Sequence, residues 1–286
     1  FFFESAQTVL RNENSRYYKL ISDLVFNVDA ERIVNFGMNV GYNSFMAGAR
    51  KIQQIVSKEH IVIPWFIALM LNGNDYLEHT NIYHSFIAQG MELGIYSWLI
   101  YSHDNIEYIL DLAKAFKECA FVIFCPPDKI IPSLLDEANS IYNLMFAIRY
   151  CDTAADTCSL LRSRKFLYSV YHSYKENTEV HSLDEILNDT ENMHAAFSLL
   201  YPSPYFYNGQ SSVYQYILKQ RYLQEYRTVP FDIIHDSHYI NGIIAGQKCS
   251  ALFLKKDTST LFNGRTINTK SNILNNSLYE ILKNLS

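Results

Sequence analysis

The sequence lacks several features that would place it at once in a membrane, nucleic-acid-binding or secreted class. Its longest apolar run, IVIPWFIALML at residues 61–71, contains a proline and is shorter than the roughly 20 residues that span a bilayer. The formal net charge of -5 offers no basic surplus for phosphates, so nucleic acid is not an expected partner. The opening FFFESAQ has no secretion-signal pattern, and we therefore expect a cytoplasmic protein.

Cysteine is scarce and its spacing matches no familiar motif. The five cysteines are Cys119, Cys125, Cys151, Cys158 and Cys249. An odd number without a CxxC pair argues against a disulfide framework. Cys151 and Cys158 are close enough in sequence to share a metal, but we favour small buried residues near strand ends.

The chain does contain a regular alternation of strand-like and helical segments. Six runs rich in apolar residues are each followed by a helical or polar segment, and the runs lie at 61–71, 95–101, 120–124, 143–150, 166–174 and 193–201. Parallel strands need such crossovers. The pattern alone fits both an open or partial (β/α) barrel and a doubly wound sheet.

The segments on either side of this alternation are less regular. Two helices, at about 4–25 and 43–60, are predicted with a glycine-bearing turn between them at 35–43. Seven tyrosines occur between residues 201 and 226. Residues 231–267 are interpreted as short strands and turns, and a last helix is expected to be capped by Asn276 or Ser277.

The order of several short segments resembles that of radical S-adenosylmethionine (radical SAM) enzymes. The segments are NFGMNVGYNSFMAGARKI, IPWFIALM, QGMELGIYSWLIYS and the tail containing INGIIAGQ and SNILNNSLYEILKN. The likeness is to hopanoid-synthesis-like and peptide-modifying members with a SPASM or twitch-like C-terminal extension. It implies an α/β fold with a partial (β/α)6 TIM-like barrel at 61–205. N-terminal helices at 1–60 and a helix plus small β-rich extension at 206–286 complete the expected organisation.

The resemblance also implies where a catalytic cluster would lie, and this chain departs from the pattern there. In such enzymes a CxxxCxxC motif after the first strand holds a [4Fe–4S] cluster through three thiolates. The matching positions here are Asp75, His79 and Ile82. Since the isoleucine side chain has no lone pair, these residues do not form the ligand set of the cubane, and no iron–sulfur cofactor is expected.

Two further family features are also altered. In the family, a GGEP-like turn binds the amino group of S-adenosylmethionine, and the matching residues here are Ser102, His103, Asp104 and Asn105. Because Asp104 keeps a negative charge, weak binding of an amino group to this turn stays open. The auxiliary-cluster cysteines of the C-terminal extension match Ile243 and Phe262.

The resemblance therefore implies a pseudoenzyme that pairs with a cysteine-bearing radical SAM paralogue as a regulatory or substrate-binding subunit. By the same analogy, a peptide substrate is expected. The tyrosine-rich segment provides a candidate contact surface, because tyrosine is enriched at interfaces; its members are Tyr205, Tyr207, Tyr214, Tyr216 and Tyr222. The alternative is that these tyrosines pack their helix on the barrel.

Two other functions remain open at this point. One is a metal-dependent enzyme that uses Asp75, His79, His103 and Asp104, since imidazole and carboxylate are ordinary metal ligands. The stretch HDSH, with His235, Asp236 and His238, belongs to the same class of hypothesis. The other is a sensor that binds S-adenosylmethionine without cleaving it.

Overall fold

One continuous sheet forms the centre of the molecule. The computed structural model describes residues 15–175, 177–203, 208, 211–246, 251–256, 259–262 and 266–286. Within them the sheet has ten strands in the order β10-β9-β8-β1-β2-β3-β4-β5-β6-β7. The strands are β1 Phe66–Met70, β2 Ser97–Tyr101, β3 Ala120–Cys125, β4 Leu144–Arg149, β5 Tyr168–Tyr174, β6 Phe197–Pro202, β7 Val229–Asp232, β8 Ala251–Leu254, β9 Ser259–Phe262 and β10 Thr266–Thr269.

Eight of these strands, β8 and β1 to β7, run parallel, and β9 and β10 form an antiparallel hairpin at one end. The six predicted strands are confirmed as β1 to β6. Because β1 to β7 follow in chain order without a reversal, the sheet is wound as a barrel rather than doubly wound. The fold is the expected partial (β/α) barrel, an eight-stranded parallel half barrel.

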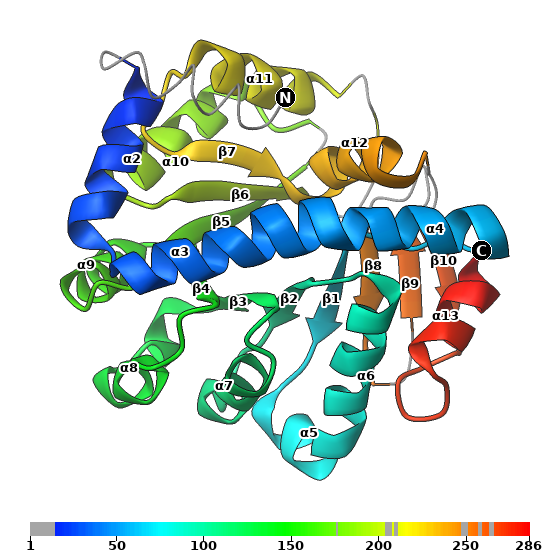
Figure 1. The fold of residues 1–286 in the computed structure, drawn as a ribbon. Helices are drawn as coiled ribbons and strands as arrows, with labels where there is room; N and C mark the ends of the chain where they lie inside the picture. Colours follow the sequence, from blue (N-terminus) through cyan, green and yellow to red (C-terminus); the bar gives the residue numbers. More distant parts are fainter. Residues whose placement is uncertain are drawn as a thin grey trace.

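Helices cover the outer face of the half barrel (Figure 1). Those between the parallel strands are α5 Gly73–Glu78, α6 Thr80–Leu93, α7 Ile106–Ala115, α8 Pro132–Ala138, α9 Ala154–Ser163, α10 Val180–Asn192, α11 Ser212–Leu223 and α12 Ile233–Ala245, with a short 3-10 turn η2 at Pro127–Lys129. The chain ends in α13 Leu278–Leu285, whose N-cap Ser277 forms a capping box with Glu280, as the sequence predicted.

The N-terminal helices differ from the prediction. After α2 Arg16–Asn27, the segments α3 Ala30–Met38, η1 Asn39–Gly48 and α4 Ala49–Glu59 follow without a break, and η1 is a π-helix. The predicted glycine-bearing turn at 35–43 is therefore wrong, because this stretch is helical. Figure 1 shows the resulting long helix crossing in front of the sheet.

Polar side chains fasten this long helix to the amino ends of the strands. The buried Arg32 donates to the carbonyls of Asn139 (2.7 Å) and Ile141, just before β4. Asn39 donates to the carbonyls of Lys117 and Cys119, just before β3. These bonds give partners to carbonyls in the loops before β3 and β4, although the Cys119 carbonyl also accepts from Asn143, and they offset the low helix propensity of the glycines.

The C-terminal region also differs from its prediction. Residues 233–245, interpreted as strands and turns, form α12, which starts at an N-cap, Asp232, whose side chain accepts from the amides of Ile234 and His235. Strands β7 and β8, both after residue 205, belong to the same sheet as β1 to β6. The division at residues 60/61 and 205/206 stays a prediction. No described helix has both the length and the apolar character needed to cross a bilayer.

Candidate functional site

The loops after β1 and β2 form the mouth of the half barrel, where parallel α/β folds usually place their chemistry. They pack directly on each other. The Gly73 amide donates to the Asp104 carbonyl (3.4 Å), and the Asn105 side chain donates to Asn74 (3.1 Å). A Cβ at Gly73 would lie 2.2 Å from the Asn105 carbonyl oxygen, so only glycine permits this contact.

The predicted turn 102–105 keeps its place at this mouth but makes internal bonds. Ser102 is buried, and its hydroxyl donates to the Asp104 carbonyl. Asn105 has a left-handed backbone with φ of 47°. His103 is exposed. The hydrogen bond between the Ser102 hydroxyl and the Asp104 carbonyl therefore stabilises the conformation of the turn itself.

The three predicted cluster positions diverge. Asp75 lies in the first turn of α5 and pairs with Lys256, which follows β8, at 3.0 Å. His79 stands at the junction of α5 and α6, with Nε2 3.8 Å from Glu78. Ile82 lies on α6 and borders a shallow hollow beside the segment that precedes α13. No three of these groups converge on one point.

We call Asp75, Glu78 and Lys256 the mouth cluster. Lys256 also reaches Glu78 at 3.4 Å, and all three side chains are between 30% and 65% exposed. The hydrogen bond to Asp75 raises the pKa of Lys256. Lys256 was not predicted from the sequence, although KKD directly after an apolar run is the signal that marks a strand end.

The residues present do not fit an iron–sulfur cubane. A carboxylate, an imidazole and a hydrocarbon stand at the positions where the resemblance implies three thiolates. Burial raises the pKa of Cys119 and of Cys158 to about 12, and it also raises that of Cys125. The thiols of these three residues are therefore protonated core groups. The burial that the sequence analysis favoured for Cys151 and Cys158 holds for Cys158, which lies on α9 and not at a strand end, whereas Cys151 is only part-buried. Cys249 lies outside the described residues.

The metal hypothesis finds no ligand set in the described part of the chain. It contains no group of three or more His, Cys, Asp or Glu side chains placed to hold a metal ion. Asp75, His79, His103 and Asp104 all belong to the described residues, so they do not form the metal site considered in the sequence analysis.

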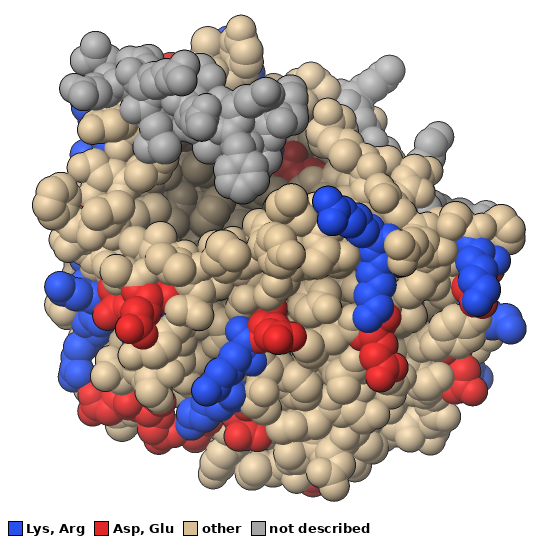
Figure 2. All heavy atoms as spheres, viewed as in Figure 1, with Lys and Arg blue, Asp and Glu red and all other residues tan. Residues whose placement is uncertain are grey.

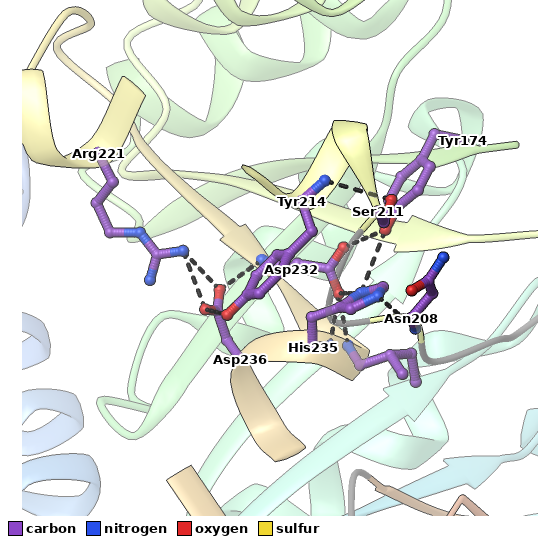
Figure 3. A network of polar contacts seen from close by, with 9 residues as sticks. Tyr174, Asn208, Ser211, Tyr214, Arg221, Asp232, His235 and Asp236 are labelled. Atoms are coloured by element: carbon purple, nitrogen blue, oxygen red, sulfur yellow. Dashed lines mark hydrogen bonds and ion pairs between the residues drawn. The ribbon is translucent and has the colours of Figure 1, made fainter. Parts of the chain in front are cut away.

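A second polar cluster lies at the other side of the half barrel, at the ends of β5 and β7 (Figure 3). We call it the α12 cluster, and its members are Tyr174, Tyr214, Arg221, Asp232, His235 and Asp236. Tyr174 donates to Asp232 (2.5 Å), and His235 Nδ1 lies 2.9 Å from the same carboxylate. The Asn208 amide donates to His235 Nε2 at 3.1 Å. Both imidazole nitrogens are thus engaged.

Asp236 holds the second half of the α12 cluster. Arg221 donates to it at 2.8 Å, Tyr214 at 3.0 Å, and the Asp232 amide at 2.8 Å. Burial raises the pKa of Asp236 even though Arg221 opposes that shift. The HDSH stretch therefore places His235 and Asp236 in a buried, mutually bonded network.

An aromatic row runs across the concave face of the sheet between these clusters. Neighbouring ring centroids lie 6.2 Å apart for Phe253 and Tyr101, 4.3 Å for Tyr101 and Phe124, and 5.1 Å for Phe124 and Tyr171. Tyr201 continues the row at 6.3 Å from Tyr171. The sequence analysis missed this row, because it arises from strand register and not from any local motif.

The remaining predicted positions have diverse environments. Tyr214 is buried against His235, with ring centroids 4.6 Å apart, so it does not belong to an exposed contact surface. Tyr216 is half-buried and donates to Asp184, whereas Tyr222 is 86% exposed. Tyr205, Tyr207 and the Phe262 side chain lie outside the described part of the structure. Ile243 is 66% exposed on α12, and not in a turn as predicted.

Comparisons with known proteins give a fold but no family. No family model matches the sequence, and no curated protein matches it. Solved structures of SuiB from Streptococcus suis do match. The structure bound to precursor peptide SuiA has a TM-score of 0.58 at 11% identity, over 82% of this chain and 68% of that one.

SuiB alone matches with a TM-score of 0.56 at 10% identity, over 82% of this chain and 69% of that one. SuiB bound to S-adenosylmethionine matches with a TM-score of 0.55 at 9% identity, over 82% and 67%. The chain has a radical SAM-like fold. At this identity the likeness extends to the fold alone.

Proposed function

We propose that this chain is a catalytically inactive radical SAM-like protein that binds a peptide as the regulatory or substrate-binding subunit of an active, cysteine-bearing paralogue. The observation that carries the proposal is the mouth cluster. Lys256 pairs with Asp75 and Glu78 at the strand end where the resemblance implies three thiolates. A cation bound to two carboxylates is electrostatically stable without any cofactor.

The packing of the loops supports the same proposal. Gly73 and Asn105 are in direct contact, and the turn 102–105 hydrogen-bonds within itself and to the β1 loop. Backbone groups that would otherwise bind a cofactor are already paired.

The aromatic row supports a peptide as the bound molecule. Tyr101 and Tyr201 are half-buried, so part of each residue stays accessible at this row. Aromatic rings offer large contact area at low entropic cost, which suits side chains of a peptide. SuiB, whose fold is similar, has been solved with the precursor peptide SuiA.

Anaerobic reconstitution with iron and sulfide tests the inactive state. We expect no stoichiometric cluster in the absorbance spectrum and no S-adenosylmethionine cleavage, because the required thiolates are lacking. A stoichiometric cluster would contradict the proposal. Calorimetry with S-adenosylmethionine checks the sensor alternative, for which saturable binding without cleavage is the positive result.

Co-expression with a cysteine-bearing radical SAM paralogue from the same genome tests the partner. We expect the two chains to co-purify in a fixed ratio, and Tyr222→Ala to weaken the complex if α11 contacts the paralogue, since Tyr222 is 86% exposed. Tyr239→Ala on α12, where the side chain is 67% exposed, is a matched control for loss of a surface tyrosine.

A further inference from the structure

A separate cavity lies at the opposite end of the strands from the mouth cluster. Its floor includes Phe66, Ser97 and Ala120, the first residues of β1, β2 and β3. Its roof includes Val40 and Phe45 of η1. The volume of this amino-end cavity is about 480 Å³, within the roughly 300–1,000 Å³ typical of small-molecule sites.

The lining of the amino-end cavity is almost wholly apolar. Among the residues that the structure describes, no charged side chain lines it, and the one hydroxyl group in the lining, that of Ser97, lies 2.7 Å from the hydroxyl of Ser44. Ser44 in turn bonds the Asn39 carbonyl. The Ser97 hydroxyl is thus already paired, and among the described lining residues the indole N–H groups of Trp65 and Trp98 are the other side-chain donors. Water entering the cavity therefore finds few partners there, and apolar cavities of this kind bind apolar molecules.

The helix that roofs the cavity leaves room for a ligand. A Cβ built at Gly37 or at Gly41 would meet nothing within 4 Å, so both positions face open space. Gly41 lies in the π-helical segment, and π-helical turns occur frequently at functional sites. Figure 2 shows a hollow above the long helix, with uncharged residues along the part of the helix that borders it.

We propose that the amino-end cavity binds an uncharged hydrocarbon molecule, such as a free aliphatic chain. A charged ligand would lose its hydration without gaining a partner, because the lining offers no opposite charge. Nucleotides and S-adenosylmethionine are therefore not expected there. The cavity lies on the same face of the sheet as the aromatic row, with Leu99 and Val122 two residues before Tyr101 and Phe124. The proposal does not rest on the function proposed above.

The chain contains a built-in reporter for this cavity. It has two tryptophans, Trp65 and Trp98. The ring of Trp65 lies 5.0 Å from that of Phe45 in the cavity roof, whereas the ring of Trp98 packs against Gly90 of α6. A brominated dodecanol that enters will quench the fluorescence of Trp65 by contact. We expect saturable quenching, reversed by unbrominated dodecanol and unaffected by S-adenosylmethionine.

Filling the cavity should abolish this response. Gly41→Leu and Gly37→Leu each place a side chain in open space, and we expect affinity to fall at least about tenfold, because displacing two ligand methylenes has about that effect. Gly242→Leu is the matched control. It makes the same change at an exposed helical glycine with nothing within 4 Å, outside the cavity lining, and should bind as the wild type does.

Circular dichroism will establish that each variant is folded before quenching is compared. The proposal is overturned if the wild type shows no saturable quenching, or if folded Gly41→Leu and Gly37→Leu both bind as tightly as Gly242→Leu. Displacement of the brominated dodecanol by S-adenosylmethionine would also overturn the proposal, because the alcohol and S-adenosylmethionine would then share a site at the mouth.

Discussion

The mouth cluster and the α12 cluster both lie where parallel strands end, yet they are built differently. In the mouth cluster the side chains of Asp75, Glu78 and Lys256 are each at least 30% exposed. In the α12 cluster the side chains of Asp232 and His235 are fully buried, and that of Asp236 is 5% exposed. Exposed ion pairs contribute little to stability, whereas breaking a buried, bonded network costs much more.

The difference in burial indicates which polar groups are structural. The α12 cluster contains the pair Asp232 and His235, residue types that are common in catalytic sites. Because the Asn208 amide occupies Nε2 and Asp232 occupies Nδ1, the imidazole has no free nitrogen for proton transfer to a substrate. The cluster fastens α11 and α12 to β5 and β7, and it does not form an open site.

Removing Asp236 should have the largest effect of the changes that probe this comparison. Asp236→Ala leaves Arg221 without its carboxylate and the buried Asp232 amide without its acceptor. We expect a loss of about 3–5 kcal/mol in the free energy of unfolding, measured by urea denaturation. Asp156→Ala, which removes an exposed acid from the first turn of α9, is the control and should cost about 1 kcal/mol or less. Equal losses in the two variants would break the comparison.

A contact of intermediate burial should give an intermediate, pH-dependent effect. Arg162 on α9 forms a two-pronged pair with Asp23 on α2, at 2.6 and 2.7 Å, and the hydrogen bond from Arg162 lowers the pKa of Asp23 below its ordinary 3.8. A lowered acid pKa stabilises the fold above the unfolded value, and this stabilisation is lost as the pH falls through the folded-state pKa.

We therefore expect Asp23→Asn to lower the free energy of unfolding by about 1 kcal/mol or less near neutral pH. The difference from wild type should vanish in acid, which denaturation curves between about pH 2 and pH 7 will check. Asp152→Asn, at an exposed position, should differ from wild type equally across the range. A difference for Asp23→Asn that persists at the acid end would contradict the assignment.

The mouth cluster should give the smallest effect. We expect Lys256→Ala to shift the unfolding midpoint less than Asp23→Asn does, because water and salt screen the charges. In about 1 M salt, where the Debye length is near 3 Å, the shift should disappear. Lys255→Ala removes the neighbouring exposed cation and serves as the control. A salt-resistant loss on the scale of Asp236→Ala would show that the two clusters are alike.

Local patterns predicted the strands well and the irregular helices poorly. β1 to β6 are apolar runs buried on both faces, so their composition carries the signal. The helical run through residues 35–43 was missed because Gly37 and Gly41 have low helix propensity. Arg32 and Asn39 offset that cost through carbonyls more than 75 residues away in the chain. α12 was missed because short isoleucine-rich segments fit strand and helix alike.

The sequence named residues at the mouth, and their role as former cluster positions stays a prediction. Positions 75, 79 and 82 were identified, but nothing local indicated that Lys256, 181 residues after Asp75, would pair with that carboxylate. The pairing depends on β8 lying next to β1 in the sheet. Register between distant strands is set by the whole fold and leaves little trace in either segment.

By itself, the sequence determined the parallel α/β class, the scarcity of reactive cysteine and the residue types at the mouth, since these depend on composition and short-range periodicity. Only the tertiary structure decided which charges pair, that both nitrogens of His235 are occupied, and that an apolar cavity remains beneath the π-helix. Those outcomes depend on contacts between residues far apart in the chain, whose free energies appear only when the sheet has formed.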